Sequence, residues 1–149
     1  MDSFWSELAH NRTFWAVVLS GVVAQCLKIV TALFRKEKFS FSWLVDTGGM
    51  PSSHSAAVCS FAVCMAKELG ANSPFFALAV LFALITMFDA QTWRRSIGFQ
   101  AQILNKMMDD LQEMRKIRED RLKELVGHTP IEVFMGALVG IVFTLIYYG

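Results

Sequence analysis

The chain has 149 residues, a length that predicts one domain over residues 1–149. Hydrophobic residues make up 54% of it, while 14 Lys and Arg residues nearly balance 13 Asp and Glu residues at a net charge of +1. This charge gives no indication of a nucleic-acid partner, and we expect none. The apolar share exceeds what a soluble domain of this size needs, so soluble folds are disfavoured.

The apolar residues come in four blocks separated by polar segments. A helix that crosses a bilayer needs about 20 residues at a rise of 1.5 Å per residue. Residues 14–34 form the clearest block, residues 55–69 and 74–90 are shorter, and residues 131–148 close the chain. We therefore predict an all-α fold, a polytopic membrane helix bundle of about four spans.

Two cations mark the end of the first span. Lys28 and Arg35 are seven residues apart, two helical turns, and so lie on nearly one helix face. Arg35 can reach water from the helix end, whereas Lys28 lies about 10 Å deeper. An ionisable residue at that depth indicates a functional site.

The stretch before the second span reads GGMPSSHSA. We expect Ser52 or Ser53 to cap a helix start, where the backbone amides and the helix dipole favour an anion. His54 could donate a proton to that anion; a plain helix cap with an incidental histidine is the alternative. A helix from Ser53 to Leu69 would be roughly 24 Å long, which recesses its start from the membrane surface.

Charged residues follow the third span. Asp89 comes directly after an apolar run, so we expect it to have a partner, with Arg94 or Arg95 about one turn later. A membrane-exit signal made by the arginines alone is the alternative. Residues 98–126 show apolar positions at helical spacing between charges, which predicts an amphipathic helical insertion. It could pack on the bundle, lie at the membrane interface or form a homodimer.

His128 and Glu132 open the last span, one helical turn apart. The carboxylate could accept a hydrogen bond from one ring nitrogen and leave the other nitrogen able to react. A capped helix with an acid favoured by the dipole is the alternative. Further along, Gly136 and Gly140 form a GxxxG pattern, which predicts close packing against another helix.

The distribution of charge predicts the topology. With four spans, residues 35–53 and 93–130 share one side of the membrane, and every Lys and Arg lies in them except Arg12, Lys28 and Lys67. By the positive-inside rule both segments are expected in the cytoplasm and both termini outside. The candidate residues then converge at the cytoplasmic ends of the spans: Lys28, Arg35, His54, Asp89, Arg94, Arg95, His128 and Glu132. Histidines, carboxylates and cations around a helix start are what cleavage of a phosphate ester requires.

These motifs resemble those of a known family. PSSH at residues 51–54 is similar to the PSGH element of the type 2 phosphatidic acid phosphatases (PAP2), which are related to vanadium haloperoxidases. Lys28 and Arg35 match the spacing of its first motif, although Lys36 stands where proline is usual. His128 with Glu132 is similar to the third motif, a His followed four residues later by Asp. The strings GGMPSSHSA and GHTPIEV resemble its divergent branch, small bacterial and plastid membrane proteins.

The resemblance implies a role for each residue. His128 would be the nucleophile that forms a phosphohistidine, Glu132 would orient it, and His54 would protonate the leaving group. Phosphate would be bound by Lys28, Arg35, Ser52, Ser53, Arg94 and Arg95, with Asp89 and Gly49 in support. Two more positions depart from the family pattern. Ser53 replaces a glycine, and Leu122 replaces the arginine that normally lies six residues before the third-motif histidine, with Arg121 one residue out of register.

We therefore expect a metal-independent, cofactor-free phosphatase of a bacterial inner membrane or a plastid-type membrane. Its substrate would be a lipid phosphate or prenyl diphosphate in the cytoplasmic leaflet. Two alternatives remain. Asp46, Asp89 and Glu132 could hold Mg²⁺ in a phosphotransferase, or the site could bind a lipid phosphate without cleaving it, in a transporter or scaffold.

Overall fold

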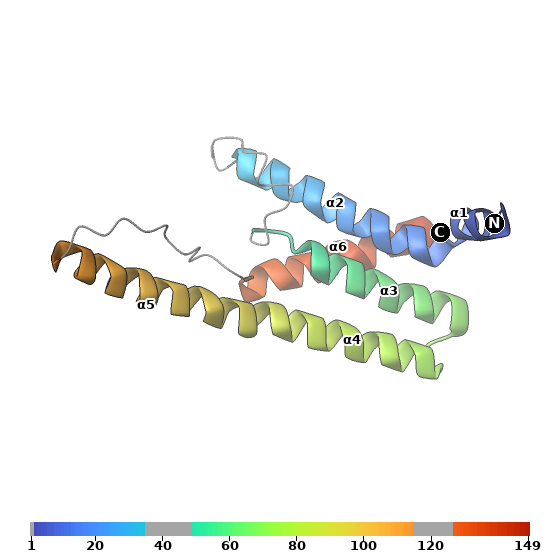
Figure 1. The fold of residues 1–149 in the computed structure, drawn as a ribbon. Coiled ribbons are helices and arrows are strands. Elements are labelled where there is room, and N and C mark those ends of the chain that lie inside the picture. The colour runs from blue at the N-terminus through green and yellow to red at the C-terminus, as the bar shows by residue number, and fades with distance from the viewer. Residues whose placement is uncertain (1, 35–48, 115–126) are drawn as a thin grey trace.

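The computed structural model describes residues 2–34, 49–114 and 127–149 (Figure 1). They form six helices: α1 (Asp2–His10), α2 (Arg12–Phe34), α3 (Ser53–Leu69), α4 (Pro74–Gln91), α5 (Trp93–Met114) and α6 (Pro130–Tyr148). No strand occurs in these three ranges. The predicted all-α helix bundle is confirmed.

Three stretches of the described chain are long and apolar enough to cross a membrane, namely Arg12–Ala32, Pro74–Asp109 and Pro130–Tyr148. The second predicted span corresponds to α3, whose 17 residues are separated by 16 steps of 1.5 Å and reach about 24 Å. This helix lies between its neighbours and packs against α2, α4 and α6 (Figure 1). Because protein surrounds α3 on three sides, it does not need the length or the continuous apolar surface of a lipid-facing span.

Small residues allow α3 and α6 to approach closely. A Cβ atom added to Gly136 would overlap the carbonyl group of Ser52, and one added to Gly140 would overlap that of Ala56. In lipid, helices associate through such close van der Waals contact because burial of apolar surface gives no gain there. The GxxxG prediction is confirmed, and α3 is the helix that packs against it.

Buried hydroxyl groups connect α2 and α6 to α3. Thr144 of α6 donates a hydrogen bond to Ser60 of α3 over 2.7 Å, and Ser20 of α2 donates to the carbonyl of Ala56 over 3.4 Å. All four residues are fully buried. The interface between these helices is therefore formed by small residues and by polar groups. Its hydrogen bonds hold α2 and α6 in register with α3.

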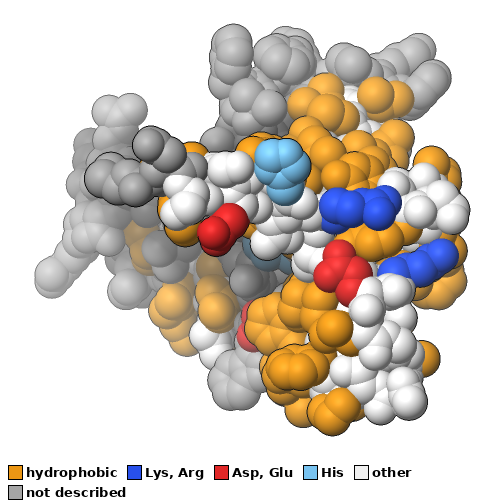
Figure 2. Space-filling view, turned by 90° about the vertical axis from the view of Figure 1, so that its right-hand side faces the viewer, with side chains coloured by type: hydrophobic (Ala, Val, Ile, Leu, Met, Phe, Trp, Pro, Cys, Tyr) orange, Lys and Arg blue, Asp and Glu red, His pale blue; other side chains and the backbone are white. Residues whose placement is uncertain are grey.

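Side-chain contacts also join the helices at the end of the bundle that holds both termini. The guanidinium of Arg12 lies 4.6 Å from the centre of the Tyr148 ring, and the Tyr148 hydroxyl donates a hydrogen bond to Glu68 and contacts Thr13. Figure 2 views the molecule from this end and shows basic and acidic side chains side by side. The start of α2 is thus joined to the ends of α3 and α6.

Helix α5 continues α4 after a single residue and extends past the rest of the bundle (Figure 1). At that junction the amide and the hydroxyl of Thr92 both donate to the Phe88 carbonyl. Helix α5 covers residues 98–114 of the predicted insertion and begins at Trp93, because no helix-breaking residue separates Gln91 from Gly98. Residues 115–126 lie outside the described ranges.

Candidate functional site

Helix ends from three parts of the chain meet opposite the termini. The amide of Ser52, before α3, donates a hydrogen bond to the Glu132 carbonyl of α6 over 3.0 Å. The amide of His128, before α6, donates to the Ala90 carbonyl in the last turn of α4 over 3.1 Å. We call this part of the bundle the histidine end, because it carries His54 and His128.

The rings of His54 and His128 lie next to each other, with centroids 6.4 Å apart and planes inclined by 59°. His54 is exposed in the first turn of α3, whereas His128 is only 2% exposed. Phosphoryl transfer places the attacking and leaving atoms on opposite sides of phosphorus. Such a transfer needs two reactive groups close together, and these two imidazoles are neighbours.

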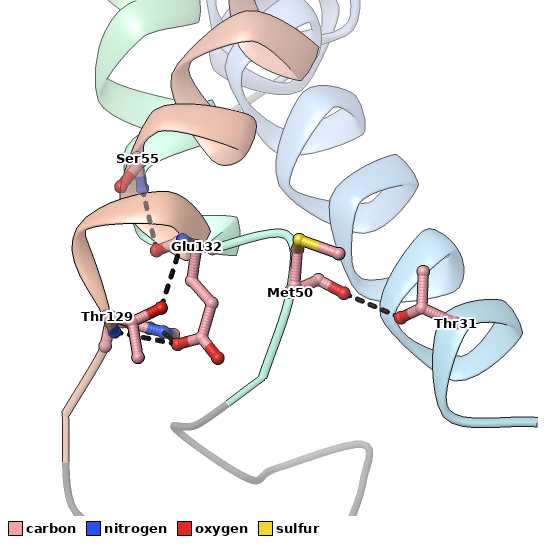
Figure 3. A network of polar contacts seen from close by, with 7 residues as sticks. Thr31, Met50, Ser55, Thr129 and Glu132 are labelled. Atoms are coloured by element: carbon pink, nitrogen blue, oxygen red, sulfur yellow. Dashed lines mark hydrogen bonds and ion pairs between the residues drawn. The ribbon is translucent and has the colours of Figure 1, made fainter. Parts of the chain in front are cut away.

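Glu132 contacts Thr129 at the start of α6 (Figure 3) and also lies beside the buried His128. Its Oε2 accepts a hydrogen bond from the Thr129 amide over 3.0 Å and lies 3.3 Å from Nδ1 of His128. Its own amide donates to Thr129 Oγ1 over 3.3 Å, which completes a capping box. One carboxylate therefore caps the helix and also contacts the imidazole.

The second nitrogen of His128 faces a different environment. Its Nε2 is buried and has no hydrogen-bond partner within the described part of the chain. With a proton on Nδ1 donated to Glu132, Nε2 carries the lone pair. A buried polar atom without a partner costs about 1–3 kcal/mol. This nitrogen is thus held ready to bond a ligand or to attack one.

Lys28 lies beside the loop that precedes α3. It is 6% exposed, and a Cβ atom added to Gly49 would sit 3.4 Å from Cγ and Cδ of its stem. Gly49 also has a φ of +93°, a conformation that side chains disfavour. Thr31 holds the same loop against α2, because its hydroxyl donates to the Met50 carbonyl over 2.7 Å. A lysine and a glycine predicted for one site therefore lie side by side.

The serines of the loop form the start of α3 as predicted. Ser52 is the N-cap, fully buried, and its Oγ accepts a hydrogen bond from the Ser55 amide over 3.4 Å. Ser53 is the first helical residue and is half-buried. The helix start points its backbone amides and the positive end of its dipole toward the histidine end.

The structure describes the remaining candidate site residues only in part. Asp89 is half-buried in the last turn of α4, next to the carbonyl that binds the His128 amide. Arg94 and Arg95 lie in the first turn of α5, and their side chains are not described. Arg35, Asp46, Arg121 and Leu122 lie outside the described ranges. Within those ranges, no three His, Cys, Asp or Glu side chains are grouped so that they could hold a metal ion.

Sequence reasoning did not assign a role to Thr31 or Ser55. Thr31 acts on the site through a hydrogen bond to the loop carbonyl of Met50, and no local pattern marks that long-range contact. Ser55 had a local signal, since it is a hydroxyl that directly follows His54 at the start of an apolar run.

A helical membrane bundle that gathers a lysine, a serine-capped helix start and two histidines at one end defines a PAP2-like membrane protein. The chain belongs to the divergent PAP2 family, whose sequence profile matches residues 9–143. It is 40% identical over 151 residues to the uncharacterized membrane protein YuiD of Bacillus subtilis (strain 168), covering 94% of this chain and 96% of that protein. No solved structure matches the chain. The resemblance seen in the sequence motifs is confirmed at the level of the family.

Proposed function

We propose that the protein is a metal-independent membrane phosphatase that hydrolyses a phosphomonoester or diphosphate of a lipid or prenyl alcohol through a phosphohistidine. One observation carries the proposal. His128 is bound to Glu132 through Nδ1, its buried Nε2 lacks a partner among the described residues, and the His54 ring lies 6.4 Å away. A carboxylate-oriented histidine beside a second histidine fits a nucleophile and an acid.

In the first step Nε2 of His128 attacks phosphorus. An N–P bond forms, the P–O bond to the lipid breaks, and protonated His54 gives its proton to the departing oxygen. Glu132 stabilises the positive charge that develops on the His128 ring. Lys28 and the start of α3 offset the negative charge on the phosphoryl oxygens.

In the second step water replaces the histidine. His54 takes a proton from the water molecule as its oxygen attacks phosphorus, the N–P bond breaks, and inorganic phosphate leaves. His128 regains its lone pair and His54 its proton, so the site returns to its starting state. When the substrate is a diphosphate, the departing group in the first step is the phosphorylated lipid alcohol.

The position of the site favours an amphiphilic substrate. The histidine end lies where spanning helices end, and nearby α4 exposes Ile85 and Phe88, side chains suited to contact with lipid tails. A phosphate in water and a chain in lipid would meet such a site together. By the positive-inside rule we place it on the cytoplasmic side of a bacterial inner membrane or a plastid-type membrane, with both termini outside.

The test is phosphate release by the purified protein from phosphatidate, phosphatidylglycerophosphate and polyprenyl phosphates. His128→Ala and His54→Ala should each lower kcat by at least about 10²-fold, the usual contribution of an acid or base. His10→Ala is the matched control, because His10 is exposed in α1 at the other end of the bundle. Full activity in His128→Ala or in His54→Ala, or loss of activity with EDTA, would contradict the mechanism.

A second candidate is binding of a lipid phosphate without cleavage, in a transporter or scaffold. It is favoured by Leu122, which stands where the family's third motif has an arginine that would stabilise the transition state. This candidate predicts tight retention of a lipid phosphate by the wild-type protein with no release of phosphate.

A further inference from the structure

Two buried side-chain polar atoms in the described ranges lack a hydrogen-bond partner, and both lie at the histidine end. One is Nε2 of His128, and the other is Oγ of Ser55, a residue only 1% exposed. The buried hydroxyls elsewhere in the bundle are bonded, as Ser20, Ser60 and Thr144 show. The unsatisfied atoms are therefore confined to one place.

Burial of the Ser55 hydroxyl is unfavourable without a ligand. A serine inside a helix usually relieves this cost by donating to the carbonyl one turn earlier, but Ser55 makes no such bond. Alanine would fill a similar space without a polar atom, and α3 does use it at the next position, Ala56. A polar group that is buried, unbonded and located at a candidate site calls for a functional explanation.

The surroundings of Ser55 indicate a phosphoryl oxygen as its missing partner. Ser55 follows His54 directly in the first turn of α3, and its amide donates to Oγ of the N-cap Ser52. Figure 3 shows it beside the start of α6, where Glu132 binds Thr129 and His128. The helix start favours an anion at this end of the bundle, and so does Lys28, whose stem lies beside Gly49 in the loop before α3.

We propose that Ser55 is a further substrate-binding residue, whose Oγ–H donates a hydrogen bond to an oxygen of the phosphoryl group held between the two histidines. The inference rests on the proposed function and adds a residue to its site. The hydroxyl acts as a donor and not as a nucleophile, because none of the described side chains accepts its proton. It complements the lysine, which supplies charge, with a neutral hydrogen-bond donor.

Binding of orthovanadate, an analogue of a phosphoryl group in transfer, tests this role in the purified full chain. Ser55→Ala should weaken vanadate binding about 10-fold or more, as expected for a lost hydrogen bond to a charged group. Its Tm should stay unchanged or rise, because a buried hydroxyl without a partner is removed. Ser60→Ala is the matched control: it should keep the vanadate affinity and lower the Tm, since it removes the bond to Thr144.

The outcomes separate this inference from the function on which it rests. Wild-type protein that binds vanadate, together with Ser55→Ala protein that binds it equally well, would overturn the role of Ser55 and leave the phosphatase proposal standing. Wild-type protein that neither binds vanadate nor releases phosphate would overturn both. Weaker binding in both serine variants would attribute the effect to helix packing and would also refute the inference.

Discussion

Replacement of Glu132 by glutamine separates its effect on the helix from its effect on the histidine. Glutamine can still accept the hydrogen bond from the Thr129 amide and complete a capping box. It removes the charge that lies 3.3 Å from Nδ1 of His128. At an effective dielectric constant of 20, a unit charge pair at that distance interacts by about 5 kcal/mol. Loss of this stabilisation as the ring becomes positive should lower kcat by about 10³- to 10⁴-fold.

The assay combines the rate of phosphate release with the Tm of the same preparation. Glu132→Gln should keep a Tm close to that of the wild type and lose activity, whereas Glu132→Ala should lose activity and also about 1 kcal/mol of stability, because the capping box is broken. Wild-type kcat in Glu132→Gln would refute the reasoning. It would show that the carboxylate caps α6 and does nothing for His128.

Two glycine variants test the packing that brings the site together. Gly49→Ala should lower stability by about 1–2 kcal/mol, because its φ of +93° disfavours a side chain; an unchanged Tm would contradict this account. Gly136→Ala should cost about 1–3 kcal/mol and lower activity, because the added Cβ overlaps the Ser52 carbonyl and separates α3 from α6. Gly21→Ala is the control for both, since its Cβ would meet the Ser53 carbonyl at an ordinary 3.9 Å.

The features that sequence reasoning predicted are those with local causes. The start of α3 at Ser53 follows from a serine cap, and the start of α6 follows from Thr129 and the acid three residues later. The contact between Glu132 and His128 was also predictable, because one helical turn separates them. Each of these depends on residues within a few positions of one another.

The features that it did not predict depend on tertiary contacts. The loop carbonyl of Met50 meets Thr31 because the chain turns back at Gly49 onto α2. The buried state of Ser55 and of Nε2 of His128 depends on how three helix ends pack together. Helix α5 begins at Trp93, before the polar segment that starts at residue 98, because charged residues after an apolar span mark a membrane exit without ending the helix.

The most direct test of the account is the chemical identity of the intermediate. Purified protein mixed with a lipid phosphate labelled on phosphorus and quenched in alkali, where phosphohistidine survives, should carry the label on the peptide that contains His128. The label should be lost in His128→Ala and retained in His10→Ala. Turnover of the lipid with no label on any histidine, or label on His54 in place of His128, would contradict the assignment of nucleophile and acid.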